Sequence, residues 1–157
     1  MSEPLSREAR RRARRAALQM LYEWEVGGLD LDEVREVYRA MQQTPLDDEE
    51  ERFATGLLRG TVSRLHEVDA LIASQAEHWR LERMALVDRA ILRLAVFELL
   101  AAPATPRPVV INEAIELAKT FSTDAAVKFV NGILDGVAKR VAEGPPDDVP
   151  APRPETP

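Results

Sequence analysis

The chain has 157 residues, of which 45% are apolar and 31% are charged, and its formal net charge is -6. This size fits one domain with a packed core, and no charge-free apolar run approaches the ~18 residues that a membrane span needs. The absence of cysteine excludes disulfides and thiolate metal sites, and it indicates a reducing, cytoplasmic compartment. The basic N-terminus is not followed by an apolar segment, so we expect no signal peptide.

Helical periodicity runs through most of the chain, and no segment shows the alternation of a strand. We expect helices over about residues 6–26, 31–42, 47–65, 68–79, 85–101, 109–121 and 124–142. The pattern therefore predicts an all-α bundle, with a folded domain over residues 1–144 whose first eight residues begin as a flexible basic arm. Residues 145–157 hold six prolines and almost no large apolar side chains, which predicts a disordered tail.

Local signals fix several of these boundaries. Ser6 is a good N-cap for the first helix, and Gly27-Gly28 ends it. Asp47 with Glu50 three residues on has the spacing of a capping box. The helix over 85–101 is apolar nearly all round, so we expect it at the centre of the fold.

Two further details of the helices carry expectations about packing. Gly56 and Gly60 lie four residues apart on one face of the third helix, where they would let another helix approach closely. Asn112, Glu113 and Glu116 share a face of the helix over 109–121, where we expect them to bond neighbouring loops.

The first fifteen residues form a basic segment on an acidic protein. They contain six arginines against Glu3 and Glu8, a net charge of +4 that leaves -10 for the remainder. Such a segment indicates a local contact with a polyanion, most often nucleic-acid phosphate. At 100° per residue one stripe of the first helix is formed by Arg11, Arg15, Leu18 and Tyr22.

This stripe predicts binding of single-stranded nucleic acid. Arg7 and Arg14 lie beside it, while the alanines with Met20 and Trp24 face the other way, into the core. Guanidinium groups would follow the phosphates, and the tyrosine ring would stack on a base. The same pattern also fits a solvated basic face with a half-buried tyrosine.

A second candidate group lies in the last helix. If its apolar residues face inward, Lys128 points outward and Phe129 sits at the edge of the core. The alternative interpretation is a core phenylalanine beside a surface lysine. The two histidines, His66 and His78, have no neighbouring ligands at metal-binding spacing, and the acidic run from Asp47 to Glu51 suits a helix start, so we expect no metal and no cofactor.

Several blocks of the chain resemble the NusB family of bacterial transcription antitermination factors. The resemblance is carried by RRRAR at 10–14, ALQMLY at 17–22, DRAILRLA at 88–95, INEAIELAK at 111–119 and KFVNGILD at 128–135. The last two blocks together are highly specific, whereas the arginine run alone is weak. The resemblance covers about residues 6–142.

The resemblance implies a fold and a function. The family fold is a bundle of about seven helices in two packed lobes. Its members are not enzymes; they bind the boxA element of nascent RNA as a heterodimer with NusE, a ribosomal small-subunit protein. The complex joins NusA, NusG and RNA polymerase and suppresses premature termination, notably on ribosomal RNA operons. Some members are thought to hide the arginine face in a homodimer.

The resemblance also implies roles for particular residues. The RNA-contacting arginines of the family match Arg10, Arg11, Arg12 and Arg14, its stacking tyrosine matches Tyr22, and the last helix contributes Lys128 and Phe129. The helical stripe adds Arg15. Where many members have a second acid before the last helix, this chain has Ala125.

A protein partner would have to bind a surface other than the basic segment. Asp88 and Glu98 are polar residues on the otherwise apolar helix over 85–101, and their exposure would create a small partner-binding patch. Two other functions fit the residues less well. One is an RNA-targeting domain of a ribosomal RNA cytosine methyltransferase, which would need a Rossmann-like domain and a cysteine; the other is a protein adaptor whose arginines bind an acidic partner.

Overall fold

The computed structural model describes residues 5–76, 80–101 and 105–143, and within these ranges the chain forms seven α-helices and no strand. The helices are α1 Arg7–Gly27, α2 Leu31–Met41, α3 Asp48–Ser63, α4 Leu65–Gln75, α5 Leu86–Ala101, α6 Arg107–Phe121 and α7 Asp124–Glu143, with a short 3-10 turn, η1, at Leu81–Arg83. The predicted all-α fold is confirmed.

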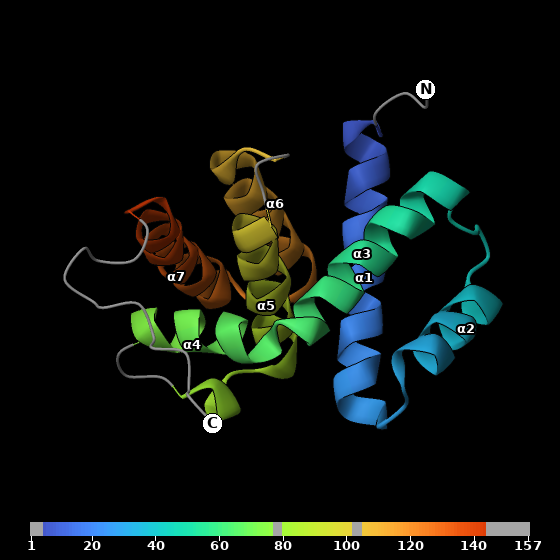
Figure 1. Cartoon of the computed structure of the whole chain (residues 1–157), viewed down its shortest axis with the longest axis horizontal. Coiled ribbons are helices and arrows are strands. Elements are labelled where there is room, and N and C mark those ends of the chain that lie inside the picture. The colour runs from blue at the N-terminus through green and yellow to red at the C-terminus, as the bar shows by residue number, and fades with distance from the viewer. Residues whose placement is uncertain (1–4, 77–79, 102–104, 144–157) are drawn as a thin grey trace, which may run out of the picture.

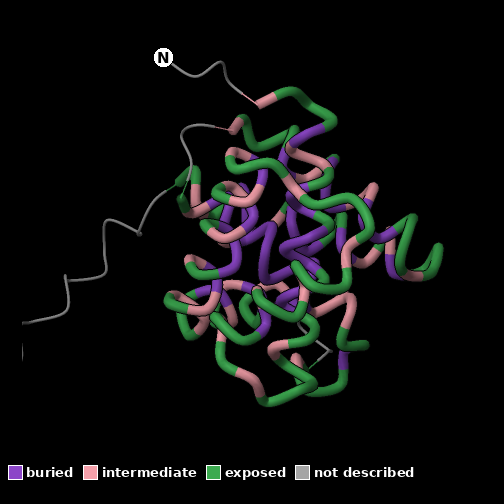
Figure 2. The backbone as a smooth tube through the Cα atoms, turned by 90° about the vertical axis from the view of Figure 1, so that its right-hand side faces the viewer, coloured by how far each residue is buried: buried purple, intermediate pink, exposed green. Residues whose placement is uncertain are grey.

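The helices form two packed lobes (Figure 1). In one lobe α3 crosses α1, and α2 lies at the outer side; α4 to α7 form the other. Helix α5 contacts α1, α3, α4, α6 and α7, and the buried residues gather in the middle of the molecule (Figure 2). The predicted central position of this helix is confirmed, because its buried residues come from all sides of the helix.

Helix α1 begins and ends where local chemistry predicts. The Oγ of Ser6 accepts a hydrogen bond from the backbone N–H of Ala9 at 3.1 Å. Gly28 closes the helix with φ of 68°, a left-handed conformation that glycine adopts without strain. At the start of α3, Asp47 and Glu50 make both hydrogen bonds of the predicted capping box.

Tertiary packing shifts some boundaries. Helix α4 begins at Leu65, three residues earlier than predicted, and ends at Gln75, while residues 77–79 lie outside the described ranges. Helix α6 begins at Arg107, since Pro108 lies in the first turn, where no backbone N–H is needed. The expected tail, 145–157, also lies outside the described ranges, and Arg7 and Glu8 of the expected flexible arm belong to α1.

The expectation for the two glycines holds at one of them. A Cβ on Gly60 would lie 2.0 Å from the ring of Phe97, so this side chain of α5 occupies the space over Gly60 on α3. A Cβ on Gly56 would meet nothing within 4 Å. The absence of a side chain is therefore needed at Gly60 and not at Gly56.

Helices α1 and α5 run antiparallel and are joined by ion pairs at both ends. Near the start of α1, Arg14 pairs with Glu98. Near its end, Glu25 pairs with Arg89 at 2.5 Å and with Arg93 at 3.3 Å. The cation is on α1 at one end and on α5 at the other.

In the part of the chain that the structure describes, no helix is long and apolar enough to cross a membrane.

Candidate nucleic-acid interface

The basic segment lies on the outer surface of α1, as its helical spacing predicts. Arg12, Arg15 and Tyr22 are exposed, and Arg10 and Arg11 are half-buried. Leu18 is only 4% exposed, so the expected stripe is interrupted between Arg15 and Tyr22. The predicted core face is confirmed: the alanines and Met20 are buried, and Trp24 packs against them.

Arg11 is held by a buried carboxylate of α6. Its Nε lies 3.1 and 3.0 Å from the two oxygens of Glu113, whose exposed fraction is 4%. Arg7 is a more distant second partner of Glu113, at 3.8 Å. The prediction that Glu113 bonds a neighbouring loop is wrong: it bonds α1, because α6 turns this carboxylate toward the basic segment.

Arg12 is held in the same way by Glu50 of α3. The Nε of Arg12 donates to the carboxylate at 2.7 Å, and Glu50 also completes the capping box of α3. The hydrogen bond and the negative charge of Glu50 raise the pKa of Arg12 further above its ordinary value. One buried carboxylate therefore serves both the start of α3 and the basic segment.

Arg14 differs from the sequence expectation. Its side chain is buried, its Nε and Nη2 donate to the two oxygens of Glu98 at 2.7 and 3.0 Å, and its guanidinium lies 5.3 Å from the ring centre of Phe53. The expected exposure of Arg14 and of Glu98 is wrong for one reason: the two charges neutralise each other inside the interface between α1 and α5. Neither side chain is presented as a docking surface.

A hollow of about 450 Å³ lies between the start of α1 and the start of α6. It is lined by Arg7, Arg10, Arg14, Pro108, Val109, Asn112 and Glu113. Arg10 lines this hollow, and its buried Nε has no hydrogen-bond partner among the described residues. Arg15 likewise has no ion pair among the described residues, so Arg10 and Arg15 are the arginines of α1 least committed to the protein itself.

The second candidate group is placed as the sequence predicts. Lys128 is exposed on α7, and Phe129 is half-buried and packs against the core. Ala125 is exposed in the first turn of the same helix. Helix α7 packs on α4, α5 and α6, so Lys128 and Phe129 are carried by a different helix from the arginines.

The expected partner patch is reduced to the start of α5. Asp88 is half-buried, and its Oδ1 accepts a hydrogen bond from the Oγ of Ser122 at 2.5 Å, which ties it to the end of α6. Leu86 and Phe121, near the two ends of this contact, are exposed. The candidate partner surface therefore consists of Asp88 with the exposed apolar residues Leu86 and Phe121, and Glu98 is not part of it.

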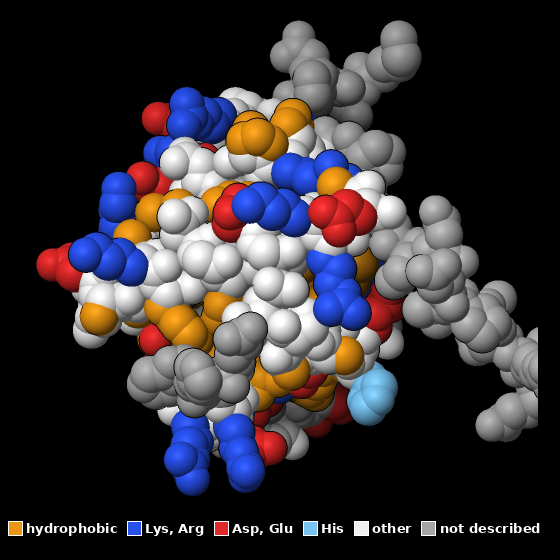
Figure 3. Space-filling model, turned by 90° about the vertical axis from the view of Figure 1, so that its left-hand side faces the viewer, with side chains coloured by type: hydrophobic (Ala, Val, Ile, Leu, Met, Phe, Trp, Pro, Cys, Tyr) orange, Lys and Arg blue, Asp and Glu red, His pale blue; other side chains and the backbone are white. Residues whose placement is uncertain are grey.

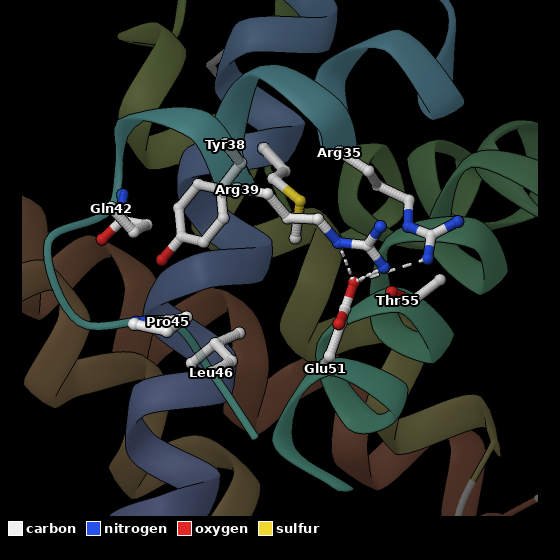
Figure 4. Close-up of a pocket in the computed structure, with 9 residues that line it drawn as sticks. Arg35, Tyr38, Arg39, Gln42, Pro45, Leu46, Glu51 and Thr55 are labelled. Carbon is white, nitrogen blue, oxygen red and sulfur yellow. Dashed lines mark hydrogen bonds and ion pairs between the residues drawn. The ribbon is translucent and has the colours of Figure 1, made fainter. Parts of the chain in front are cut away.

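Two other regions show how the remaining charges are used. A hollow of about 190 Å³ lies between α2 and α3, where Arg35 and Arg39 both point at Glu51 (Figure 4). On the α7 side of the molecule basic and acidic side chains are interspersed (Figure 3).

His66 is exposed, His78 lies outside the described residues, and no three His, Asp or Glu side chains among those described are grouped to hold a metal ion.

An all-helical bundle that gathers arginines and a tyrosine along one helix of an acidic chain belongs to the class of polyanion-binding helical proteins. The NusB family model matches residues 11–139. A transcription antitermination protein NusB of Koribacter versatilis is 46% identical over 132 residues, 84% of this chain and 90% of that protein. One of Symbiobacterium thermophilum is 44% identical over 137 residues, 83% and 90% of the two chains.

Solved structures agree with these relatives. The structure of T. maritima NusB superposes with a TM-score of 0.75 at 38% identity, covering 88% of this chain and 93% of that one. A structure described as antitermination factors NusB and NusE in complex with dsRNA gives 0.75 at 28% identity, covering 85% and 98%. The chain belongs to the NusB family, whose members are antitermination factors and not enzymes.

Proposed function

We propose that this protein binds boxA-type single-stranded RNA together with NusE and suppresses premature termination, notably on ribosomal RNA operons, in a complex with NusA, NusG and RNA polymerase. The observation that carries the proposal is the exposed face of α1, where Arg12, Arg15 and Tyr22 stand beside the half-buried Arg10 and Arg11. The related structure of NusB and NusE in complex with dsRNA supports the binding of RNA together with NusE.

Affinity would come from phosphate contacts and sequence preference from stacked bases. Arginines on one face of a helix can follow the phosphates of a strand, and exposed aromatic rings can hold splayed-out bases. Tyr22 is 38% exposed, so its side chain is accessible to a base. Lys128 and Phe129 offer the same pair of functions on α7.

The experiment is RNA binding by the full chain with and without NusE, measured over a range of salt concentrations. With several phosphate contacts at ~0.7 counterion each, the log–log slope should be roughly -2 to -4 for a single strand. Parallel measurements with single-stranded and double-stranded RNA of the same sequence test whether the protein prefers single strands. A slope near zero would contradict the electrostatic account, and RNA that fails to compete with an acidic protein partner would favour the adaptor function.

The patch around Asp88 is the proposed docking surface for NusE. It lies at the junction of α5 and α6, so NusE and RNA should bind together and each should tighten the other. Asp88→Lys should weaken NusE binding and leave the weaker RNA binding of the protein alone intact. Competition between NusE and RNA in a titration would contradict this arrangement.

A further inference from the structure

Two arginines of the basic segment are held from beneath by carboxylates of other helices. Glu113 of α6 and Glu50 of α3 are each 4% exposed. Both accept from the same atom of their arginine: Arg11 donates through Nε at 3.0 and 3.1 Å, and Arg12 through Nε at 2.7 Å. The two carboxylates come from different lobes, and each bonds its arginine only at Nε, Glu113 with both oxygens and Glu50 with one.

This geometry leaves the outer edge of each guanidinium uncommitted. Among the described residues the Nη atoms of Arg11 and Arg12 make no hydrogen bond, and the two side chains are 36% and 55% exposed. Arg14 is the contrast, since it donates to Glu98 through both Nε and Nη2. The paired N–H groups at the Nη end are the donors that suit the oxygens of a phosphate.

We propose that Glu113 is a positioning residue, which fixes Arg11 so that its Nη atoms face an RNA phosphate, and that Glu50 does the same for Arg12. The inference rests on the proposed RNA binding by α1. A phosphate cannot displace either carboxylate, because a buried carboxylate that loses its cation is strongly destabilised. The arginine therefore stays on its carboxylate and binds the phosphate with its other edge.

Positioning has a physical benefit for binding. An arginine side chain loses much rotamer freedom when it is fixed on a ligand. Here the fold has already fixed the side chain, so less freedom is lost when RNA arrives. Without the carboxylate, Arg11 would keep its charge but sample many rotamers on the surface of α1.

The opposite role for Glu113 predicts an effect of opposite sign. If the carboxylate masks Arg11, its negative charge opposes the approach of phosphate and its removal tightens RNA binding. Positioning predicts weaker binding, although the substitution makes the protein less negative. The sign of the change therefore separates the two roles.

The test is Glu113→Ala in the full chain with NusE, with binding of a short single-stranded RNA followed by fluorescence anisotropy. We expect the affinity to fall 3- to 10-fold and the salt slope to lose about 0.7, one phosphate contact. Unchanged or tighter binding would overturn the inference. Absence of RNA binding by the unsubstituted protein with NusE would instead contradict the proposed function.

Glu116→Ala is the matched control. Glu116 lies one turn further along α6, is half-buried, and pairs with Lys119 at 3.5 Å. Glu116 lines a small hollow with Arg11 and Arg15 but makes no hydrogen bond or ion pair with either of them. Its substitution therefore removes the same charge from the same place without removing a partner of Arg11, so RNA affinity should stay the same or rise slightly. An equal loss in both variants would show a general effect on α6 and would overturn the positioning role.

A measurement on the unsubstituted protein covers the case in which Glu113→Ala does not fold. The Hε of Arg11 should be protected from solvent exchange in side-chain NMR spectra, because it is bonded to Glu113. Positioning predicts that this protection persists, or increases, when RNA is added. Loss of the protection on RNA binding would show that phosphate displaces the carboxylate, and would overturn the inference.

Discussion

Two arginine-rich regions of the molecule use the same side chain in different ways. On α1, Arg11 and Arg12 each have a buried carboxylate of their own. On α2, Arg35 and Arg39 converge on one partly exposed carboxylate, Glu51 of α3 (Figure 4). The first arrangement leaves the Nη atoms of Arg11 and Arg12 without a hydrogen bond among the described residues, whereas in the second both arginines pair with the same carboxylate.

The difference follows from how each helix is anchored. Helix α1 buries a long apolar face and needs no help from its surface charges. Helix α2 has one buried residue, Val34, and it packs on α1 with half-buried side chains such as Tyr38, while its arginines pair with Glu51 of α3. Arginine count alone therefore does not locate a polyanion site; the position of the carboxylates does.

The largest effect is expected where an arginine is fully internal. Arg14→Ala leaves Glu98 buried without its cation, which should lower the free energy of unfolding by about 3–5 kcal/mol. Urea denaturation followed by circular dichroism measures it. The double variant Arg14→Met with Glu98→Leu removes both charges at similar volume and should recover most of the loss; a double variant as unstable as Arg14→Ala would contradict this explanation.

The next effect compares the tyrosines of the two regions. Tyr22→Ala should cost about 1–3 kcal/mol of RNA affinity through lost base stacking. Its effect on thermal stability should be small, because the ring is exposed. Tyr38→Ala is the control, since this ring is half-buried on α2 and burial raises the pKa of its hydroxyl; it should reduce stability and leave RNA affinity unchanged. The reverse result would assign Tyr22 to the core.

A smaller effect is expected for the arginines of α2. Arg39 is largely exposed, and its pair with Glu51 should contribute only about 0.2–1 kcal/mol to stability. Arg39→Ala should also leave the salt slope of RNA binding as it is, whereas Arg12→Ala should lower it. Equal changes in the slope would mean that both regions contact RNA, which would remove the distinction between them.

The smallest effect concerns the aspartates that cap α2 and α3. Hydrogen bonds from backbone N–H groups lower the pKa of Asp30 and of Asp47, and the charge of Arg12 lowers that of Asp47 further. Because the folded pKa is lowered, each cap stabilises the protein above the unfolded value of about 3.9, and this contribution is lost as the pH falls through the folded pKa.

Arg12→Ala separates the two caps. It should raise the pKa of Asp47 toward its ordinary value and leave that of Asp30 unaltered, because Asp30 lies on α2 and does not depend on Arg12. Carboxyl NMR titration of the two side chains measures both changes in one experiment. A shift of both pKa values by the same amount would indicate a general change of charge and not a local contact.

The sequence predicted what local chemistry determines. The cap at Ser6, the capping box at Asp47 and Glu50, and the inward face of α1 depend on residues a few positions apart, and all are present. The exposed positions of Lys128 and Tyr22 follow from helical spacing in the same way.

The sequence could not predict which charges meet across the bundle. Arg14 and Glu98 are 84 residues apart, and Arg11 and Glu113 are 102 residues apart, so no periodicity links them. Arg14 looks like its exposed neighbours in the sequence, and only the packing of α5 against α1 shows that it is internal. The one available signal was a glutamate on the apolar helix α5, which needs a buried cation.

Ion pairs of opposite polarity at the two ends of the contact between α1 and α5 fix the position of α1 along α5. A slide of α1 by one turn, about 5.4 Å, would separate Arg14 from Glu98 and Glu25 from Arg89 in a single step. Intermediate positions are therefore disfavoured at both ends together. Arg11 and Tyr22, which lie about 16.5 Å apart along the axis of α1, are therefore held together in one position relative to α5. If α1 binds RNA as proposed, the strand would meet contact groups whose spacing the fold does not adjust.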